Sequence, residues 1–317
     1  MLFNFSSLYD IRSSQKNFRP ECLAWGASSG EAGSRKQKGR RSKKFCIYTI
    51  QMTRPKKICL RLQGGFCNRV RAIVSGMLWA KDIGASLELF WPVEKGHMPC
   101  CLEQLIDPSS IAGLTYVHPT YLNGAKQVLT HTDMRIAAAL SDYEIRIQSY
   151  SSFHDDLENA TARGLAALRS IRIVPELEEQ VTMVEGACIG VHVRRTDHVK
   201  CIAASPVAAF EQAIDDELLL NKDARFCLVT DDLAVKMRFQ NLYGEAIYSP
   251  TTVLGRMTAQ QQYAGVIDWL LLHRCSKILA SAGSSFSELA ALRAGIELVP
   301  VMPSRISGVV PAPSTTA

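Results

Sequence analysis

The second half of the chain carries four short, continuous apolar runs, and helix-period segments separate them. The runs are ACIGVHV (187–193), RFCLVT (225–230), KILAS (277–281) and IELVPV (296–301). Unbroken apolar strands that alternate with helices are typical of parallel sheets with helices on both faces. This alternation predicts an α/β fold.

The first half repeats the pattern less regularly. Residues 56–62, 86–92, 114–118 and 143–149 are predicted strands, residues 69–84 a helix that stops at Gly84, and residues 155–184 a helix-rich connection. A chain of 317 residues has room for two domains of roughly 120 residues each. We therefore expect an N-terminal α/β domain over 57–170 and a C-terminal α/β domain over 171–303.

Capping signals place the later helices. Ser205 and Pro206 predict a helix start with Ser at the N-cap and Pro at N1. Ser285 and Glu288 form a capping-box pattern that opens a helix ending at Gly295. Further helices are expected over 233–243 and 258–275.

The basic charge is concentrated in an N-terminal segment. Residues 1–57 hold 13 Lys and Arg against 3 Asp and Glu, and the remainder holds 23 against 27. The body is slightly acidic, so stable nucleic-acid binding by the fold is not expected. Residues 1–56 are predicted to be a disordered basic tail. A nuclear-targeting or anionic-polymer-binding arm, and a native start at Met52, remain alternatives. Residues 304–317 are predicted to be a flexible Pro/Ser/Thr tail.

Ten cysteines occur without any C-x-x-C pair, and Cys59, Cys188 and Cys227 fall inside apolar runs. This placement predicts free, buried thiols in a reducing compartment. The sequence has no signal-peptide pattern, and no apolar run approaches the roughly 20 residues of a membrane span. We expect a soluble protein in the cytoplasm or another reducing compartment, without a transmembrane segment and with a secretory location disfavoured.

Four predicted strand ends carry unusual residues, and ligands of doubly wound sheets bind at such ends. The first is GGFCNR (64–69). Gly64 and Gly65 let the backbone approach a ligand, the helix start suits an anion, and Asn68 and Arg69 add donors. A tight turn with a polar cap is the structural alternative, and Cys67 is expected to be a packed thiol.

The second is His192-Val193-Arg194-Arg195-Thr196-Asp197-His198. Adjacent arginines at a strand end need an anion or carboxylate to satisfy them, and arginine suits bidentate binding of a diphosphate. The alternative is an Arg–Asp ion-pair network that braces the loop.

The third and fourth strand ends carry acidic and hydroxyl side chains. Asp231 and Asp232 could cap the following helix, bind a nucleoside or bind a metal, but no supporting ligand cluster lies nearby in the sequence. In SAGSSFS (281–287) a Gly turn and a helix start form a second anion cradle. Ser285 is the predicted N-cap, which leaves Ser284 freer for a ligand.

Taken in order, the four motifs resemble the inverting fucosyltransferase superfamily. That group includes α1,6-fucosyltransferases, the nodulation-factor fucosyltransferase and protein O-fucosyltransferases. The similarity is specific in IGVHVRRTD (189–197), LVTDD (228–232) and ILASAGSSFSELA (278–290), with Asp268 where relatives carry an acidic residue. GGFCNR is similar to the first-loop motif of the group.

The resemblance implies a GT-B-like fold of two Rossmann-type doubly wound domains facing a cleft. It implies GDP-fucose as donor substrate, a glycan or protein acceptor, and no cofactor or metal. By this resemblance Arg194 contacts the β-phosphate and stabilises the leaving diphosphate. His192, Arg195 and Asp197 belong to the same donor-binding motif, in which Arg195 and Asp197 position the nucleotide. Contacts to the nucleoside are implied for Asp231 or Asp232 with Asp268, and contacts to phosphate for Ser284, Ser285 and Asn68.

One departure concerns the acceptor side. The α1,6 relatives place a Lys directly after the motif's Asp and a Glu four residues later, where this chain has His198 and Ile202. His198, with an ordinary pKa near 6.5, is the candidate base. A non-catalytic sugar- or nucleotide-binding member of the fold is the alternative, and a nucleic-acid-associated protein acting through its basic arm is a third hypothesis.

Overall fold

The computed structural model describes residues 57–94, 97–118, 144–181, 188–196, 199–250 and 253–303. Both sheets lie in one compact unit, Met52–Ala317. The boundary expected between 170 and 171 therefore stays a prediction, and the tails expected at 1–56 and 304–317 lie outside the described residues.

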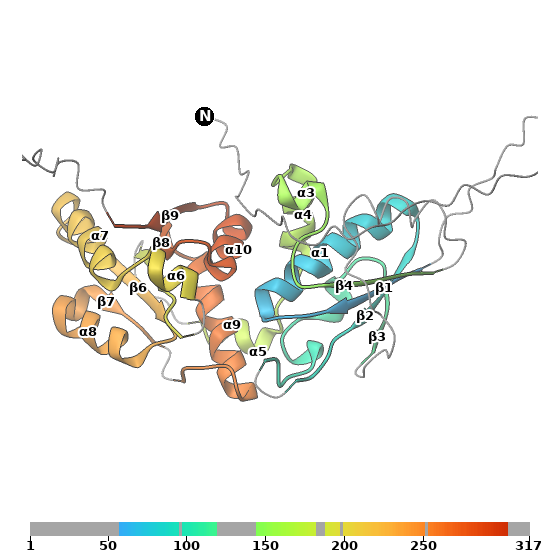
Figure 1. Ribbon diagram of the computed structural model, residues 1–317, viewed down its shortest axis with the longest axis horizontal. Helices are drawn as coiled ribbons and strands as arrows, with labels where there is room; N and C mark the ends of the chain where they lie inside the picture. Colours follow the sequence, from blue (N-terminus) through green and yellow to red (C-terminus); the bar gives the residue numbers. More distant parts are fainter. Residues whose placement is uncertain are drawn as a thin grey trace, which may run out of the picture. The chain divides into compact units, whose positions relative to one another are not determined.

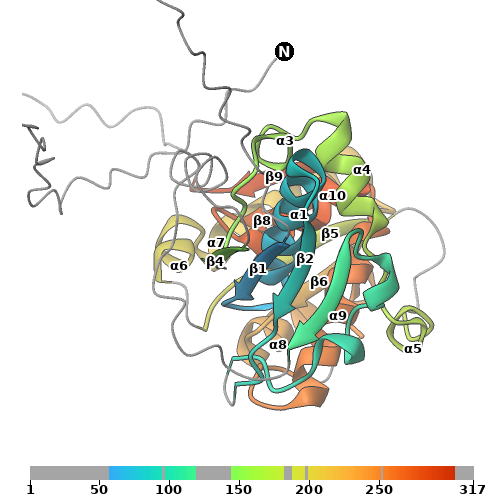
Figure 2. The ribbon, with the colours of Figure 1, turned by 90° about the vertical axis from the view of Figure 1, so that its right-hand side faces the viewer.

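The first sheet has four parallel strands in the order β3-β2-β1-β4 (Figures 1 and 2). They are β1 (Lys57–Leu62), β2 (Ser86–Phe90), β3 (Leu114–His118) and β4 (Glu144–Ser149), and β1 pairs in parallel with both β2 and β4. Helix α1 (Phe66–Ile83) connects β1 to β2. The short 3-10 helices η1 (Leu102–Gln104) and η2 (Pro108–Ser110) lead into β3.

A helical connection leads from the first sheet to the second. It contains α3 (Asp155–Glu158), α4 (Ala162–Ser170) and α5 (Pro175–Glu178). The helix-rich segment expected over 155–184 is thereby confirmed within its described residues.

The second sheet has five parallel strands in the order β7-β6-β5-β8-β9. They are β5 (Cys188–Val193), β6 (Arg225–Thr230), β7 (Ile247–Tyr248), β8 (Lys277–Ser281) and β9 (Glu297–Val301). The helices are α6 (Val199–Ala204), α7 (Val207–Leu220), α8 (Leu233–Tyr243), α9 (Ala259–His273) and α10 (Ser285–Ala294), with the 3-10 turn η3 (Gly244–Ala246) before β7. Counted within its own half, this strand order is 3-2-1-4-5, which is the Rossmann order.

The two faces of the second sheet are covered by different helices (Figure 1). Val191 and Val193 belong to one buried cluster with Phe210 of α7 and Phe239 of α8. Cys227 and Val229 belong to the other cluster, which includes Trp269 of α9, Leu289 of α10 and the core of the first sheet. The expected α/β class with two Rossmann-like parallel sheets is confirmed.

Helix starts differ from the sequence prediction at three places. Helix α1 begins at Phe66 rather than 69, with Gly65 at its N-cap. Pro206, not Ser205, occupies the N-cap of α7, because the Ser205 hydroxyl accepts a hydrogen bond from the Ala282 N–H at 2.9 Å. Helix α10 has Ser284 at its N-cap and no capping box at Ser285.

The helix ends at Gly84 and Gly295 are as predicted, since both glycines are left-handed, with φ 68° and 75°. The eight described cysteines are free, and seven of them are buried, including Cys59, Cys188 and Cys227.

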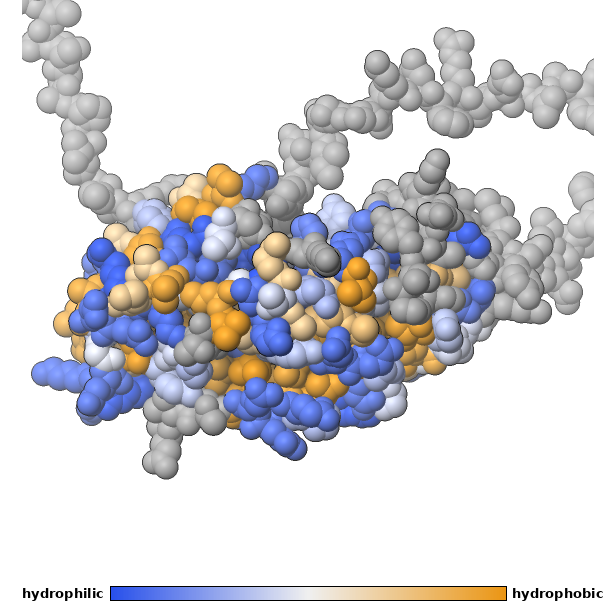
Figure 3. Space-filling view, turned by 90° about the horizontal axis from the view of Figure 1, so that it is seen from below, coloured by the Kyte–Doolittle hydropathy of each residue, from blue (hydrophilic) through white to orange (hydrophobic). Residues whose placement is uncertain are grey.

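The surface mixes polar and apolar side chains (Figure 3). Exposed large apolar residues include Leu233, Met237 and Leu242 of α8. Within the described ranges, no helix is both long enough and apolar enough to cross a membrane.

Candidate functional site: the carboxyl ends of β5, β6 and β8

The strand order of the second sheet reverses between β5 and β8, and Arg194 lies at this point. The Arg194 N–H donates to the Ser281 hydroxyl at 2.9 Å, so the loop after β5 is attached to the end of β8. A crevice at such a reversal is the place where open parallel sheets bind ligands. The topology thus brings the second and fourth sequence motifs together.

Asp231 at the end of β6 holds the loop after β5. Its carboxylate accepts from the Arg195 N–H at 2.7 Å, from the Thr196 hydroxyl at 2.7 Å and from the Thr196 N–H at 3.3 Å. Arg194 Nη1 completes the network with an ion pair to Asp231 Oδ2 at 3.1 Å. We call residues 194–196 with Asp231 the Arg194 loop. The Arg–Asp network weighed as an alternative from sequence therefore exists.

Arg195 turns back into the protein. Its Nη1 donates to the Ile202 carbonyl at 3.3 Å, and its Nη2 donates to the Ser205 carbonyl. Burial lowers the pKa of Arg195, while the carboxylates of Asp232 and Asp231 act in the opposite direction. Arg195 thus connects the loop to α6, while the Arg194 side chain keeps 21% of its surface exposed.

His192 lies under the Arg194 loop, near the end of β5. It is 4% exposed, its ring lies 5.0 Å from the ring of Phe286 in α10, and its Nδ1 has no hydrogen-bond partner among the described residues. Burial lowers the pKa of His192 to about 4, Arg194 lowers it further, and Asp231 opposes the shift. The imidazole is therefore neutral at pH 7, which avoids a second positive charge beneath Arg194.

The first sequence motif forms an open turn at the end of β1. Gly64 has φ +76°, and an added Cβ there would lie 3.0 Å from Asn68 Nδ2, so Asn68 folds back over this glycine. A Cβ at Gly65 would meet nothing within 4 Å. In the part that the structure describes, the Asn68 side chain has no hydrogen bond, which leaves its amide available to a ligand.

Arg69 differs from the sequence expectation, because its side chain enters the core. It is 0% exposed, it donates to the carbonyls of Gly64 and Pro92 at 2.9 Å each, and its guanidinium lies 4.6 Å from the ring of Trp91. Burial lowers the pKa of Arg69 to about 10. These contacts are those of a residue that fixes the turn, and the early start of α1 explains them.

The start of α1 lies close to the second sheet. Phe66 packs edge-on against Trp269 of α9 at 5.3 Å between ring centroids. Burial raises the pKa of Cys67 to about 12, whereas the charges of Arg71 and Arg194 act to lower it. Cys67 is therefore an inert, packed thiol as expected, and Arg194 lies within electrostatic range of it. The first motif thus joins the second and fourth.

The acidic candidates have local partners. Asp232 caps α8 by accepting from the N–H groups of Ala234 and Val235 at 2.8 and 3.1 Å. Asp268 of α9 is buried, and burial lowers the pKa of Lys236 while the charge of Asp268 opposes this shift. Asp268 and Lys236 therefore lie close enough to interact.

The fourth motif presents a hydroxyl at a helix start. Ser284 is 6% exposed and makes no capping hydrogen bond, and Ser285 is the first residue of α10. Ser284 rather than Ser285 thus stands at the N-cap position, and its side chain does not cap the first N–H groups of α10. Asp197 and His198, the remaining members of the second motif, lie outside the described residues.

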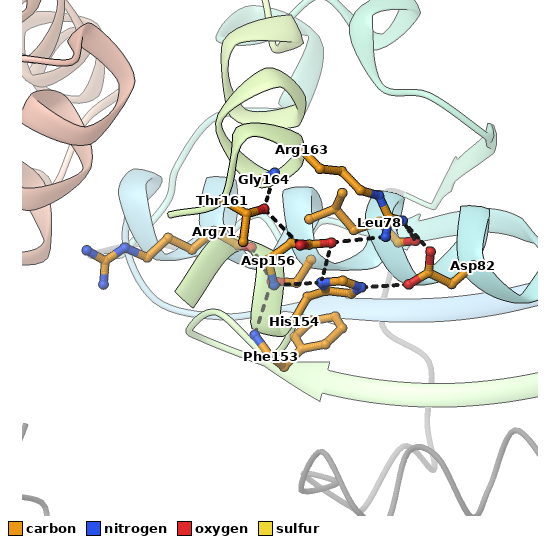
Figure 4. Close-up of polar contacts among 10 residues, drawn as sticks. Arg71, Leu78, Asp82, Phe153, His154, Asp156, Thr161, Arg163 and Gly164 are labelled. Atoms are coloured by element: carbon orange, nitrogen blue, oxygen red, sulfur yellow. Dashed lines mark hydrogen bonds and ion pairs between the residues drawn. The ribbon is translucent and has the colours of Figure 1, made fainter. Parts of the chain in front are cut away.

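A second polar network lies beside the first sheet (Figure 4). His154 Nε2 lies 2.9 Å from Asp82 Oδ2, and Arg163 pairs with Asp82 and, at 2.9 Å, with Asp156. Burial alone would raise the pKa of Asp82, but hydrogen bonds from Arg163 and His154 outweigh it and hold the pKa below its ordinary value. We call Asp82, His154, Asp156 and Arg163 the His154 cluster.

The His154 cluster attaches α3 and α4 to α1. Arg163 Nη2 donates to the Leu78 carbonyl of α1 at 3.1 Å, and the Thr161 hydroxyl donates to Asp156 at 2.8 Å. The helices approach so closely that a Cβ on Gly164 would lie 2.2 Å from the Asp156 carbonyl oxygen. Each charged group of the cluster has an opposite partner, so we read it as structural.

Two residues near the Arg194 loop were not anticipated from sequence. Arg71 of α1 forms an ion pair with Glu288 of α10 at 2.9 Å. The only sequence signal was the spacing of Arg71 four residues after Cys67, which places both on one face of the helix. Among the described residues, no group of three or more His, Cys, Asp or Glu side chains is arranged to hold a metal ion.

Fold and site together define a two-sheet, Rossmann-like α/β protein with a cationic loop at the switch point of its second sheet. No protein-family model matches the chain, and no curated protein matches it. Several solved structures match it in fold. NodZ α-1,6-fucosyltransferase, known from Bradyrhizobium and solved after soaking with GDP-fucose, aligns with a TM-score of 0.57 and 16% identity, over 75% of this chain and 92% of that one.

Two further solved structures share the fold. A variant of Arabidopsis thaliana FUT1 in complex with GDP aligns with a TM-score of 0.52 and 12% identity, over 78% of this chain and 72% of that one. POFUT1 in complex with GDP aligns with a TM-score of 0.50 and 9% identity, over 78% of this chain and 98% of that one. At this identity the likeness establishes the fold alone. The likeness predicted from the motifs is confirmed at the level of the fold, an α/β arrangement with two Rossmann-like parallel sheets.

Proposed function

We propose that the chain is an inverting, metal-independent glycosyltransferase that moves fucose from GDP-fucose to a hydroxyl group of a glycan or protein. The observation that carries the proposal is the Arg194 loop. It places a partly exposed arginine at the switch point of a Rossmann-like sheet, beside the uncapped start of α10. This combination suits a nucleoside diphosphate.

In this proposal the acceptor oxygen attacks the anomeric carbon of fucose as the bond to the β-phosphate oxygen breaks. The bonding electrons leave with GDP, and the acceptor proton passes to a base, for which His198 is the candidate. Arg194 stabilises the charge that develops on the leaving oxygen, because its guanidinium is already oriented by Asp231. Asn68 and the glycines before it would close on the donor from the first sheet.

We assign the other candidates from the contacts that they make. Arg195 and Asp231 hold the loop rather than presenting free groups, so we assign them to positioning. Ser284 remains a candidate phosphate ligand with the first N–H groups of α10, including that of Ser285. Asp268, beside Lys236, is the nucleoside candidate, whereas Asp232 is occupied as a cap.

A non-catalytic nucleotide-sugar- or glycan-binding protein is the second candidate. Ile202 stands where α1,6 relatives have a Glu, and its backbone carbonyl is a partner of Arg195. The isoleucine side chain at this position cannot accept a proton. Under this alternative the site binds GDP without turnover.

A nucleotide-sugar panel tests both functions. The protein is incubated in EDTA with GDP-fucose, GDP-mannose and UDP-linked sugars, and products are identified by mass spectrometry. Slow hydrolysis or transfer from GDP-fucose alone supports the transferase. GDP binding without turnover on a wide acceptor panel supports the nucleotide-sugar-binding protein, and no GDP binding at millimolar nucleotide excludes both this protein and the transferase.

A further inference from the structure

An ion pair joins the helices that follow the first and fourth motifs. Arg71 Nη2 of α1 lies 2.9 Å from Glu288 Oε2 of α10, with side-chain exposures of 20% and 39%. The function proposed above gives neither residue a role. Glu288 lies in the first turn of α10.

The charges of Arg71 and Arg194 act on the same side chain, that of Cys67. Cys67 lies one helical turn before Arg71 on the same face of α1. The charges of Arg71 and Arg194 both act to lower the pKa of its thiol, against the larger effect of burial. Arg194 is in turn bonded to Ser281, three residues before the N-cap of α10. The charges of Arg71, in α1, and of Arg194, in the loop after β5, therefore both act near the start of α1.

The Arg71 side chain is directed away from the His154 cluster. Figure 4 shows it extending away from the labelled residues of that cluster, while the Arg71 backbone carbonyl accepts from the Ser75 hydroxyl at 2.9 Å. The guanidinium thus belongs with α10 and not with the structural network of the first sheet.

Separating the Arg71–Glu288 pair requires little free energy. A partly exposed ion pair contributes little to stability because water competes for both groups. Glu288 lies in the first turn of α10, where the helix dipole stabilises a carboxylate even without its partner. A diphosphate carries more charge than one carboxylate and offers bidentate acceptors, so it is the stronger partner for a guanidinium.

We propose that Arg71 exchanges partners when the donor binds, leaving Glu288 and contacting the diphosphate. This inference rests on the proposed function, since it assumes a nucleoside diphosphate at the Arg194 loop. Glu288 then acts as a competitor that holds Arg71 near the site until the ligand displaces it. The exchange favours diphosphates over monophosphates, because only the second phosphate adds enough charge to draw Arg71 away.

Calorimetric titration with GDP and GMP tests the exchange. Arg71→Gln should weaken GDP binding by about tenfold while changing GMP binding far less. Glu288→Gln should tighten GDP binding by about threefold, because it releases Arg71 from competition. In the Arg71→Gln background, Glu288→Gln should have almost no effect. Glu217→Gln is the matched control. It also removes one negative charge, but Glu217 pairs with Lys277 at the opposite end of β8.

The outcomes separate the two claims. If the wild type binds GDP but Glu288→Gln weakens binding or leaves it unchanged, the pair is a fixed contact between the sheets and the exchange is wrong. The same conclusion follows if Glu288→Gln tightens GDP equally with and without Arg71, or if Glu217→Gln tightens it as much. If the wild type does not bind GDP, the proposed function fails and the exchange fails with it.

Discussion

The Arg194 loop and the His154 cluster are built from the same residue types, but they lie at different places in their sheets. The Arg194 loop follows β5 at the point where the strand order reverses. The His154 cluster lies between helices α1, α3 and α4. At the strand-end loop Asp231 pairs with Arg194 and also accepts from backbone and hydroxyl donors, whereas in the helical cluster Arg163 pairs with two carboxylates.

This difference distinguishes the Arg194 loop, a candidate binding site, from the His154 cluster, a structural network. In the His154 cluster the polar groups close on one another and fix α4 against α1. At the Arg194 loop, Asp231 fixes the backbone, and the second arginine is held by carbonyl groups that carry no full charge. A preoriented arginine that keeps part of its side chain exposed at a strand end suits an anionic ligand.

The largest expected effect comes from Arg194→Lys. Lysine keeps the charge but loses the planar fork, so transfer from GDP-fucose should fall by about 10²–10³-fold, as for loss of one preoriented donor. The measurement is the initial rate at saturating donor, with circular dichroism to confirm folding. Normal turnover by this variant would make Arg194 a brace, like Arg163.

A second expected effect is a pH dependence at the site. The pKa of His192 is about 4 in the folded chain and about 6.5 when unfolded, because burial opposes its charge. Between these values the unfolded state binds the extra proton, so stability falls as pH falls from about 6.5 and levels off near 4. Over that window His192 should account for at most about 3 kcal/mol.

Urea unfolding at several pH values checks this prediction. His192→Asn should flatten the loss of stability between pH 6.5 and 4. His273 is a second contributor, since burial lowers its pKa to about 3, and it remains in the variant. An unchanged pH profile in His192→Asn would show that His192 is solvated rather than enclosed beneath Arg194.

The His154 cluster should give the opposite pattern of effects. Asp156→Ala removes the acceptor for Arg163 and Thr161, so we expect a loss of about 1–3 kcal/mol in unfolding free energy. GDP affinity should not change. Asp156→Asn, which keeps an acceptor for Thr161, is the matched variant and should lose less. A fall in GDP affinity without a loss of stability would move this cluster into the binding site.

The smallest expected effect is at Asp232. Asp232→Ala removes the cap of α8 and should cost about 1 kcal/mol, whereas Asp232→Asn retains a capping oxygen and should cost only a few tenths. Both variants should bind GDP as the wild type does. If Asp232→Asn loses GDP affinity at unchanged stability, Asp232 contacts the nucleoside, as the resemblance first suggested for Asp231 or Asp232.

The fold could be predicted from sequence where one local signal dominated. Continuous apolar runs gave the strands to within a residue or two, as in 225–230, and glycine gave the ends of α1 and α10. Helix starts were less predictable, because distant groups compete for the capping side chain. Ser205 is the example, since its hydroxyl is taken by the N–H of Ala282, 77 residues away.

The site was predictable as a set of loops but not as a set of contacts. Strand ends meet at one edge of a parallel sheet, so the grouping of Arg194, Asp231 and Ser281 follows from topology. The burial of Arg69 depended on α1 starting three residues early, and the pairing of Arg71 with Glu288 depended on how α1 and α10 pack. Neither packing is encoded in local sequence.

The most direct test of the central claim is a GDP titration of the wild type, Arg194→Ala and Arg163→Ala, with melting temperatures measured in parallel. Arg194→Ala should weaken GDP binding by at least about tenfold and melt within a few degrees of the wild type, since Asp231 keeps its three other donors. Arg163→Ala should melt lower and bind GDP normally. If Arg194→Ala instead binds GDP as the wild type does and loses stability, Arg194 is a structural brace and not a ligand of the diphosphate.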